Sequence, residues 1–339
     1  MILAAVAVPL TLLITTNIGL NAVFTIVTMF TPVQFSYGQV SGKIIGAPIK
    51  ISNVTLIHTG RTLKIENVTF DWQLKALTAN NIRGLEQFLP YASKVAYQEF
   101  LINKAYAQIN FKENSLVFNV QLFGQAAQAP LHGNVRLTNH NSMWDINHAV
   151  LMIGDNVINL QRHNVKQYKW NITIKQPNVM FKNSTGTIIA HGHIQDLNTT
   201  PSIQAHVQTK HFAMSNYAVN NLQARVNLVI QPSAPLFANI TASNVRFDAT
   251  HLEDIKLSLH GDLAQHTLNF NAMYENEPVA LHIKGRLNEK MWHAHDLMLG
   301  YKKEQLVGTS TYNLKDRSST TSLRGSIATF PTTAVLKFT

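Results

Sequence analysis

Several features that would point to a familiar chemistry are missing from this sequence. It has no cysteine, which excludes a disulfide framework and thiol catalysis. Charged residues make up 14% of the chain, against roughly 25% in typical soluble domains, and Asn, Gln, Thr, Ser and His supply the remaining polarity. No phosphate-binding loop, dinucleotide-binding glycine motif, zinc-protease motif or nucleophile elbow occurs. We therefore expect neither an enzyme nor a bound cofactor.

The basic residues outnumber the acidic ones but are not clustered in the sequence. The net charge is +10 and the pI is near 9.7, but the basic residues spread thinly from Lys43 to Lys337. Nucleic-acid-binding domains usually cluster such residues on one helix or face. We therefore expect no nucleic-acid partner. Lys and Arg on the polar faces of strands are the simpler interpretation, and it is compatible with attraction to anionic lipid headgroups.

Charge is absent altogether before Lys43. Residues 1–16 are mostly apolar, a short polar interruption follows, and residues 20–30 are apolar again. A transmembrane helix needs about 20 apolar residues, so the first stretch alone is slightly short. One interpretation is a single helix over about residues 2–30, tilted or broken near Gly19. The favoured one is a spanning helix that lacks its first residues, followed by an interfacial helix at about residues 18–29.

Two other interpretations of this end fit less well. A cleaved signal peptide would need a positive start and an Ala-x-Ala-like site before a polar mature start, and neither is present. A buried core helix is the remaining structural alternative. We therefore expect residues 1–31 to be a helical membrane anchor. The positions expected to face lipid are Leu3, Val6, Leu10, Leu12, Leu13, Ile14, Leu20, Phe24 and Val27.

After Pro32 the hydrophobic period changes to two. Apolar and polar residues alternate through many short segments, and successive side chains of a strand point to opposite faces. Each segment would therefore have one apolar and one polar face, as in an antiparallel sheet that is wet on one side. We expect residues 32–339 to form one β-rich domain. The clearest alternating segments are 68–74, 116–122, 170–174, 222–230, 255–259 and 279–283.

Turn signals separate these segments at intervals that suit a meander of hairpins. They are Asn80-Asn81, Pro177-Asn178, residues 198–201, Gln231-Pro232 and Glu277-Pro278. Glu253-Asp254 is expected in a turn before a strand, without a catalytic role. Residues 85–106 are ambiguous, but Pro90 would break a helix there, so we expect strand.

A short pattern of Gly, any residue and an aliphatic residue recurs at uneven intervals, so it is not a strict solenoid repeat. Glycine within a strand usually marks a bend, a bulge or a close approach of two backbones. Repeated bends would let a long sheet curl around its apolar face. The pattern lies at residues 41–44, 132–135, 191–194, 260–263, 284–287 and 324–327.

So many one-sided strands need something to cover their apolar face. Two sheets could pair as a sandwich, or one sheet could close into a barrel. The third solution is an elongated, curled antiparallel sheet that forms an open apolar trough. Its interior would be left for a guest with hydrocarbon character.

Four patches of sequence, in this order, resemble those of one known family. Residues 33–46 are similar to a strand with a V-x-G-x-L-x-G pattern, and residues 65–72 are similar to an L-x-L-x-W strand. Residues 257–268 are similar to an L-x-G-T-x-x-x-H-x-L segment, with Asp262 in place of Thr, and residues 285–292 to a following G-x-L…W unit. Together with the apolar N-terminal end, they resemble the N-terminal part of the TamB family, within the AsmA-like group.

The resemblance implies a location and a role. The family is anchored in the bacterial inner membrane by a single helix, and its bulk crosses the periplasm. It supports outer-membrane protein assembly and secretion and the transport of phospholipids between the membranes, with a β trough that shields acyl chains. Its C-terminal domain, which contacts the outer-membrane partner TamA, would lie beyond Thr339, so the resemblance implies an N-terminal fragment. A positively charged stub before the anchor is also missing here.

The trough hypothesis names candidate lipid-lining residues, although for the large aromatic residues ordinary core packing is the simpler alternative. A scaffold that presents strand edges to outer-membrane partners, without lipid conduction, is the second hypothesis. A closed sandwich domain on a membrane anchor is the third. The candidate lining residues are Val68, Phe70, Trp72, Leu74, Leu116, Phe118, Val120, Leu222, Val226, Leu228, Ile255, Leu257, Leu259, Leu281 and Ile283.

Fifteen histidines raise the question of a metal site. His191 and His193 would share a strand face, as would His293 and His295, with Asp296 next to the second pair. Zinc needs three or four converging ligands, and the two pairs are far apart in sequence. We therefore expect polar-face histidines and no metal. The Asn-x-Ser/Thr sequons are expected by chance in a sequence so rich in Asn and Thr.

Overall fold

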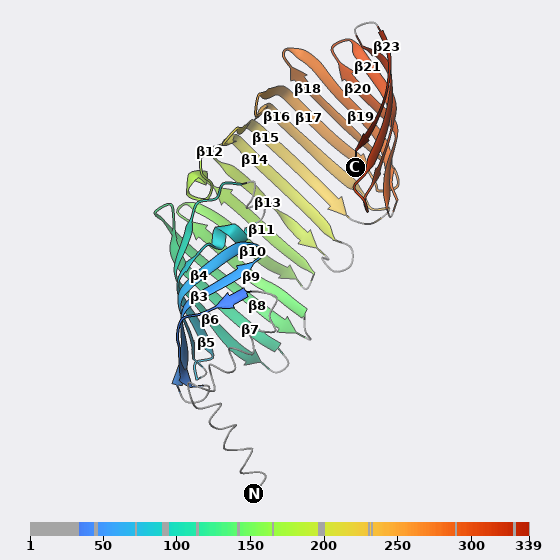
Figure 1. Ribbon diagram of the computed structural model, residues 1–339. Coiled ribbons are helices and arrows are strands. Elements are labelled where there is room, and N and C mark those ends of the chain that lie inside the picture. The colour runs from blue at the N-terminus through green and yellow to red at the C-terminus, as the bar shows by residue number, and fades with distance from the viewer. Residues whose placement is uncertain are drawn as a thin grey trace. The chain divides into compact units, whose positions relative to one another are not determined.

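The computed structural model describes most of the chain after the first 33 residues (Figure 1). The described ranges are 34–43, 47–71, 73–89, 95–112, 115–140, 143–164, 166–195, 201–229, 231, 233–288, 290–327 and 330–338. The expected anchor at residues 1–31 and the candidate residue Trp72 lie outside them. Helical structure in these ranges is limited to two single turns, η1 (Leu85–Phe88) and η2 (Pro177–Val179). No helix of the described residues is long and apolar enough to cross a membrane.

The chain divides into two compact units. Unit 1 comprises Met1–Gln161 and Gln176–Lys182, and unit 2 comprises Arg162–Lys175 and Asn183–Thr339. The expected single β domain over residues 32–339 therefore consists of two units.

Unit 1 is an antiparallel meander. Strands β1 and β2 both pair with β3, and from β3 to β10 each strand pairs with the next. Its strands are β1 (Gln34–Ser36), β2 (Val40–Lys43), β3 (Ala47–His58), β4 (Arg61–Asp71), β5 (Ala76–Arg83), β6 (Phe100–Lys112), β7 (Ser115–Ala126), β8 (Ala129–His140), β9 (Met143–Ile153) and the first part of β10 (Asn156–Asn164).

Unit 2 repeats this organisation. Strand β11 pairs with β13, the short β12 and β13 both pair with β14, and from β14 to β23 each strand pairs with the next. Its strands are β11 (Gln167–Ile174), β12 (Ser184–Gly186), β13 (Ile188–Gln195), β14 (Ser202–Met214), β15 (Tyr217–Val229), β16 (Leu236–Phe247), β17 (Thr250–Gly261), β18 (His266–Tyr274), β19 (Glu277–Leu287), β20 (Met291–Tyr301), β21 (Glu304–Asn313), β22 (Ser319–Ile327) and β23 (Phe330–Phe338).

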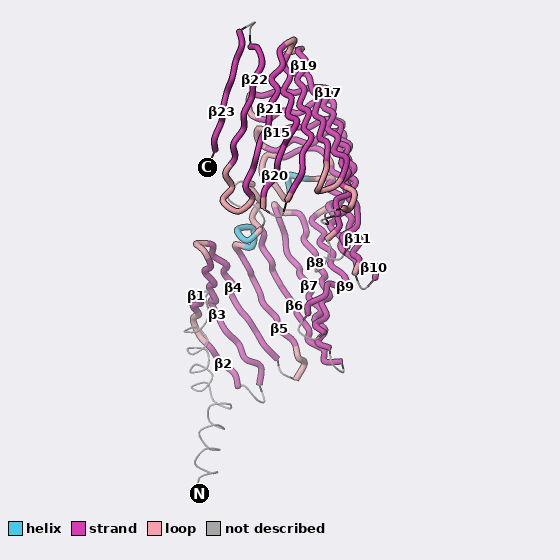
Figure 2. The backbone as a smooth tube through the Cα atoms, turned by 90° about the vertical axis from the view of Figure 1, so that its right-hand side faces the viewer, coloured by secondary structure: helices cyan, strands magenta, loops and turns pink. Residues whose placement is uncertain are grey.

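Each unit is one curved layer of strands (Figures 1 and 2). The strands pack mainly against their neighbours in the sheet, and the short turn η1 packs on β4 and β6. The expected all-β class and open antiparallel sheet are confirmed. Burial is correspondingly modest, and many of the buried residues are small or β-branched, such as Ala224, Ala242 and Ile255.

The strand register gathers the apolar residues of unit 2 on one side, called here its apolar face. One row directly across ten strands of that face is Ile172, Ala190, Val207, Ala224, Ile240, Leu257, Phe270, Leu281, Leu299 and Leu306. The neighbouring residue of each strand points the other way, onto the polar face. That row is Asn171, His191, His206, Arg225, Asn239, Ser258, Asn269, His282, Met298 and Val307.

Unit 1 has an apolar face of the same kind. The row across its strands is Ile51, Val68, Ala79, Ala105, Leu122, Gly133, Leu151 and Ile158. In both units the side chains of one row are direct cross-strand neighbours, which is the closest packing that a single sheet offers. Large side chains on these faces are half-buried because their cross-strand neighbours cover their sides.

Some expectations about local structure are wrong. Strand β4 ends at Asp71, because the Asp71 carboxylate accepts hydrogen bonds from the backbone N–H groups of Gln73 and Leu74 and so closes a turn. Leu74 is 64% exposed in that turn rather than on a strand. Residues 85–106 begin with the helical turn η1, and among the residues described in this stretch the next strand, β6, begins at Phe100. Glu277 and Pro278 open β19 instead of forming the turn before it.

Two expected turns are instead irregularities inside strands. Asn81 lies within β5 at φ 50°, and Asp254 lies within β17 at φ 48°. Short polar side chains tolerate this left-handed conformation better than others do. Asn53 in β3 and Asn221 in β15 have the same conformation. These residues locally break the alternation without ending the strand, which a turn propensity alone does not reveal.

Candidate functional site

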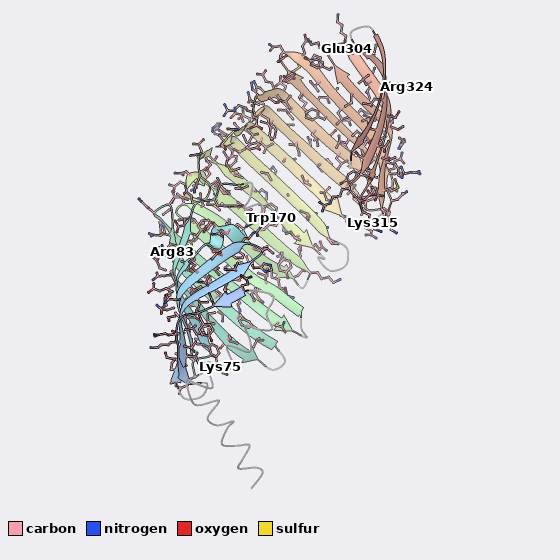
Figure 3. All side chains as sticks on the ribbon, in the orientation of Figure 1. Lys75, Arg83, Trp170, Glu304, Lys315 and Arg324 are labelled. Atoms are coloured by element: carbon pink, nitrogen blue, oxygen red, sulfur yellow. The ribbon has the colours of Figure 1, made fainter. Side chains whose placement is uncertain are left out.

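The candidate site is the pair of apolar faces, one on each unit. In the described strands β11 to β22, the apolar face of unit 2 carries two charged residues, Glu277 and Glu304. Each is the first residue of its strand. Large side chains there are partly open to solvent, with Ile203 at 39% and Phe247 at 53% exposure. Figure 3 shows side chains standing on both sides of the single layer, with Trp170 among them.

The structure brings most of the candidate lining residues onto these faces. Leu74 is the exception, in its exposed turn, and Trp72 is not described. On unit 1 the face carries Val68, Phe70, Leu116, Phe118 and Val120. On unit 2 it carries Leu222, Val226, Leu228, Ile255, Leu257, Leu259, Leu281 and Ile283. All of these are half-buried apart from Ile255, which is buried.

A small packed cluster lies in the middle of the apolar face of unit 2. Ala242, Ile255 and Ala272 are buried there, and larger residues such as Leu222 and Phe270 pack around them. The cluster shows that part of this face is ordinary core. The larger side chains around it extend the apolar surface toward solvent.

Glycines of the recurring pattern lie on the apolar faces where neighbouring backbones approach closely. A Cβ added to Gly192 would lie 1.9 Å from the carbonyl oxygen of Gln204, and one added to Gly261 would lie 2.2 Å from that of Gln265. Gly308, outside the pattern, is similar, at 1.8 Å from the Ser322 oxygen. No side chain fits at such distances, so glycine is required for these strands to come together as they do.

One polar contact on the apolar face was not foreseen. His266 is 8% exposed, and its Nε2 accepts a hydrogen bond of 2.8 Å from Trp292 Nε1, while its Nδ1 lies 3.1 Å from the carbonyl oxygen of Asp262. Nδ1 must therefore donate, which makes His266 the neutral Nδ1–H tautomer. Trp292 reaches His266 over Gly285, whose added Cβ would contact both rings. Strand spacing alone could not have indicated this contact.

Among the histidines weighed as metal ligands, most lie on the polar face as expected, whereas His266 lies on the apolar face. His191 and His193 share that face of β13, opposite Ile188 and Ile194. His293 also points to it, whereas His295 falls where the pairing between β20 and β21 shifts. In the part of the chain that the structure describes, no three His, Asp or Glu side chains converge as metal ligands.

Ionisable groups with shifted pKa values are dispersed. Burial raises the pKa of Tyr97, and the negative charge of Glu275 raises that of Tyr274. Hydrogen bonds from Ser318 lower the pKa of Asp316. These residues lie in separate turns and strand ends, so they do not form a catalytic group.

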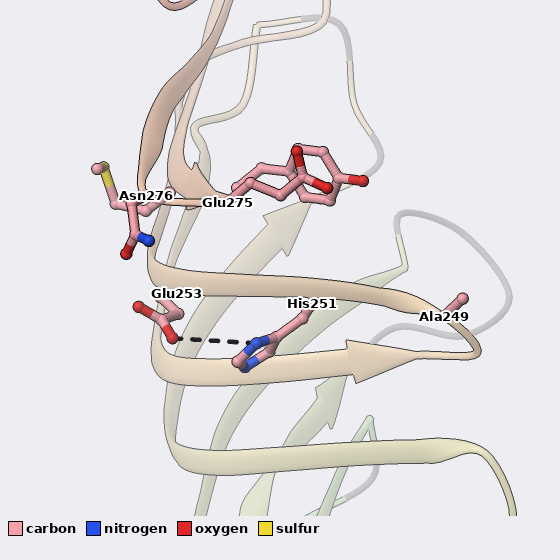
Figure 4. Close-up of a pocket in the computed structure, with 7 residues that line it drawn as sticks. Ala249, His251, Glu253, Glu275 and Asn276 are labelled. Atoms are coloured by element: carbon pink, nitrogen blue, oxygen red, sulfur yellow. Dashed lines mark ion pairs between the residues drawn. The ribbon is translucent and has the colours of Figure 1, made fainter.

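The hollow in Figure 4 is also a poor candidate for a reaction site. It encloses about 190 Å³ beside the end of β17, and His251 Nδ1 lies 3.9 Å from Glu253 Oε1 there. Both side chains are half exposed, so solvent weakens their attraction. Its lining offers no buried nucleophile or base.

An open antiparallel sheet with one apolar and one polar face in each unit defines the class of this protein as all-β. The family described as TamB, N-terminal domain, matches residues 105–295, which is more than half of the chain. The protein belongs to this family, as the resemblance of its sequence patches indicated. Comparison with curated proteins gives no match, and comparison with solved structures gives none either.

Proposed function

We propose that this protein supports phospholipid transport between the inner and outer membranes, together with outer-membrane protein assembly and secretion. The apolar faces would act as grooves along which acyl chains lie, while headgroups remain in water. The observation that carries the proposal is the unbroken apolar row across ten strands of unit 2, from Ile172 to Leu306, with no described helix laid over it. Membership of the TamB family supports it.

The energetics of such a groove suit transport better than storage. Transfer of hydrocarbon from water contributes about 0.8 kcal/mol per CH2 group. Because the face is similarly apolar from row to row, a chain that slides along it exchanges one set of contacts for an equivalent set. No charged residue inside the face would stop it. The proposal needs no catalysis by this chain and no cofactor.

The location and partners in this proposal follow from the family. We propose a single helical anchor at residues 1–31 in the bacterial inner membrane, with the β units in the periplasm. Phospholipid acyl chains are the proposed ligand. A TamA-like outer-membrane protein is the proposed protein partner, and no nucleic acid is involved.

A second candidate function is a strand scaffold without lipid conduction. In the described part of the chain, β23 pairs only with β22, so the main-chain groups along its other edge can accept another strand. A client or partner could add to this edge by β-augmentation. This function would tolerate charges on the apolar face and would be sensitive to proline in β23.

Photocrosslinking in cells separates the two candidates. A photoreactive residue at Leu257 or Phe70 probes the apolar faces, and one at Ser258, the next residue on the polar face, is the matched control. Phospholipid adducts at Leu257 and Phe70 but not at Ser258 are expected for a groove. Protein adducts alone would favour the scaffold. The absence of adducts from folded protein would rule out the groove in this segment.

A further inference from the structure

Positive charge gathers on the polar face of one part of unit 2. Between Asp155 and Asp248 the sequence has a single carboxylate, Asp196, but eight Lys or Arg residues. The five strands β11, β13, β14, β15 and β16 contain no Asp or Glu at all. Their basic and imidazole side chains are Lys169, His191, His193, His206, Lys210, His211, Arg225 and Arg246.

Three of these side chains form one row across adjacent strands. His191 of β13 lies directly opposite His206 of β14, and His206 lies directly opposite Arg225 of β15. The two imidazole rings meet edge to face, with centroids 5.0 Å apart. All three side chains point to the polar face, and no carboxylate of these strands neutralises the Arg225 guanidinium.

The row borders a hollow that is open to solvent. Its volume is about 480 Å³, and it is lined by His191, His206, Arg225, Asn227 and Phe237 among others. Arg225 is exposed, and its side chain makes no hydrogen bond or ion pair with another described residue. Its five N–H donors are therefore free to bind a ligand.

The neighbouring polar atoms can also serve as donors. Gln208 Nε2 lies 3.1 Å from His206 Nε2, so a neutral His206 that accepts this bond carries its proton on Nδ1. The Oδ1 atom of Asn227 is buried without a partner. An amide oxygen only accepts hydrogen bonds, so the donor that Asn227 brings to the lining of the hollow is its Nδ2 group.

We propose that His191, His206 and Arg225 bind a phosphate group. Guanidinium pairs with phosphate through two parallel hydrogen bonds, and imidazole N–H groups add further donors. The phosphate could belong to a phospholipid headgroup or be free in solution. The site lies on the face opposite the acyl-chain groove, so it does not depend on the proposed transport function.

The test is a titration of the full chain in neutral detergent, with the histidine side chains labelled with 15N and followed by NMR. The two probes are inorganic phosphate and dihexanoyl phosphatidylglycerol. Arg225→Gln should weaken binding about tenfold or more, as loss of a charge-assisted hydrogen bond does. Arg225→Lys, which keeps the charge, should lose less. Arg324→Gln removes the same charge from the polar face of β22 and should change nothing.

The two probes distinguish the sources of phosphate. Shifts of the His191 and His206 signals with both probes, or with phosphatidylglycerol alone, indicate a lipid headgroup site. Shifts with inorganic phosphate alone indicate a site for the free anion, and either result supports the proposal. Equal shifts in wild type and Arg225→Gln, or no shift with either probe, would overturn it. Loss of acyl-chain crosslinking at Leu257 would leave the phosphate site unaffected.

Discussion

Trp292 on β20 donates a hydrogen bond of 2.8 Å to His266 on β18, across the intervening strand β19. Gly285 of β19 lies beneath this contact and leaves room for both rings. A second tryptophan, Trp170, covers Gly192 in a similar way, but its Nε1 is buried without a partner. The two tryptophans therefore each cover a glycine but differ in hydrogen bonding, so that one serves as a control for the other.

Trp292→Phe should destabilise the protein by about 1–3 kcal/mol, because the buried His266 Nε2 would lose its donor. Trp170→Phe should have little effect or stabilise slightly, because it removes a donor that is already unsatisfied. Thermal unfolding followed by circular dichroism measures both. Equal losses for the two variants would show that ring volume, and not the hydrogen bond, is what matters.

Gly192→Ala should be strongly destabilising, because its Cβ would lie 1.9 Å from the Gln204 carbonyl oxygen. Gly300→Ala is the control, since its Cβ would meet nothing closer than 3.6 Å. That variant should be neutral or stabilising by up to about 1 kcal/mol, through lower entropy of the unfolded chain. Urea unfolding of both variants is the measurement. A tolerated alanine at Gly192 would contradict the close backbone approach.

Asn221→Ala should destabilise by about 1–2 kcal/mol relative to Asn221→Gly, because residue 221 has φ 50°. Both variants lose the hydrogen bond from Asn221 Nδ2 to Ser243 Oγ, so their difference isolates the backbone conformation. The midpoint of thermal unfolding reports it, at about 2–4 °C per kcal/mol for a unit of this size. No difference between the variants would mean that this irregularity is absent in solution.

Leu257→Asp should reduce phospholipid transfer about tenfold or more, because an unpaired carboxylate in an apolar groove is strongly unfavourable for acyl chains. Ser258→Asp places the same charge on the polar face and should leave transfer unchanged. Transfer of labelled phospholipid between membranes is measured for both, with circular dichroism to verify folding. Full transfer by a folded Leu257→Asp variant would argue against the groove.

The pKa of Asp316 lies below its usual value, because the Ser318 hydroxyl and backbone N–H both donate to its Oδ1, at 2.6 and 3.0 Å. A lowered folded pKa stabilises the turn above the ordinary carboxyl pKa, and this stabilisation is lost as the pH falls through the folded value. Ser318→Ala should raise the pKa of Asp316 toward its usual value. Carboxyl NMR titration measures this, and an unchanged titration would contradict the hydrogen bond from the Ser318 hydroxyl.

Turns predicted from local composition were wrong where Asn or Asp lies inside a strand. Asn80-Asn81 and Glu253-Asp254 have the composition of turns, yet both pairs lie inside strands. Asn and Asp accept the left-handed conformation in a turn and in a strand irregularity alike, so only the pairing partners distinguish the two. Glu66, for example, lies on the neighbouring strand and hydrogen-bonds the Asn81 side chain.

The all-β class, the apolar and polar sides of most strands and the family could be predicted from local sequence patterns. Period-two alternation is a local property, and it survives whatever the strands pair with. The division into two units could not be predicted in this way, nor could the row that aligns Leu257 with Phe270 and Leu281. The same is true of the cross-strand neighbours of His266 and Arg225. These depend on cross-strand register, which joins residues distant in sequence and is set by the whole sheet.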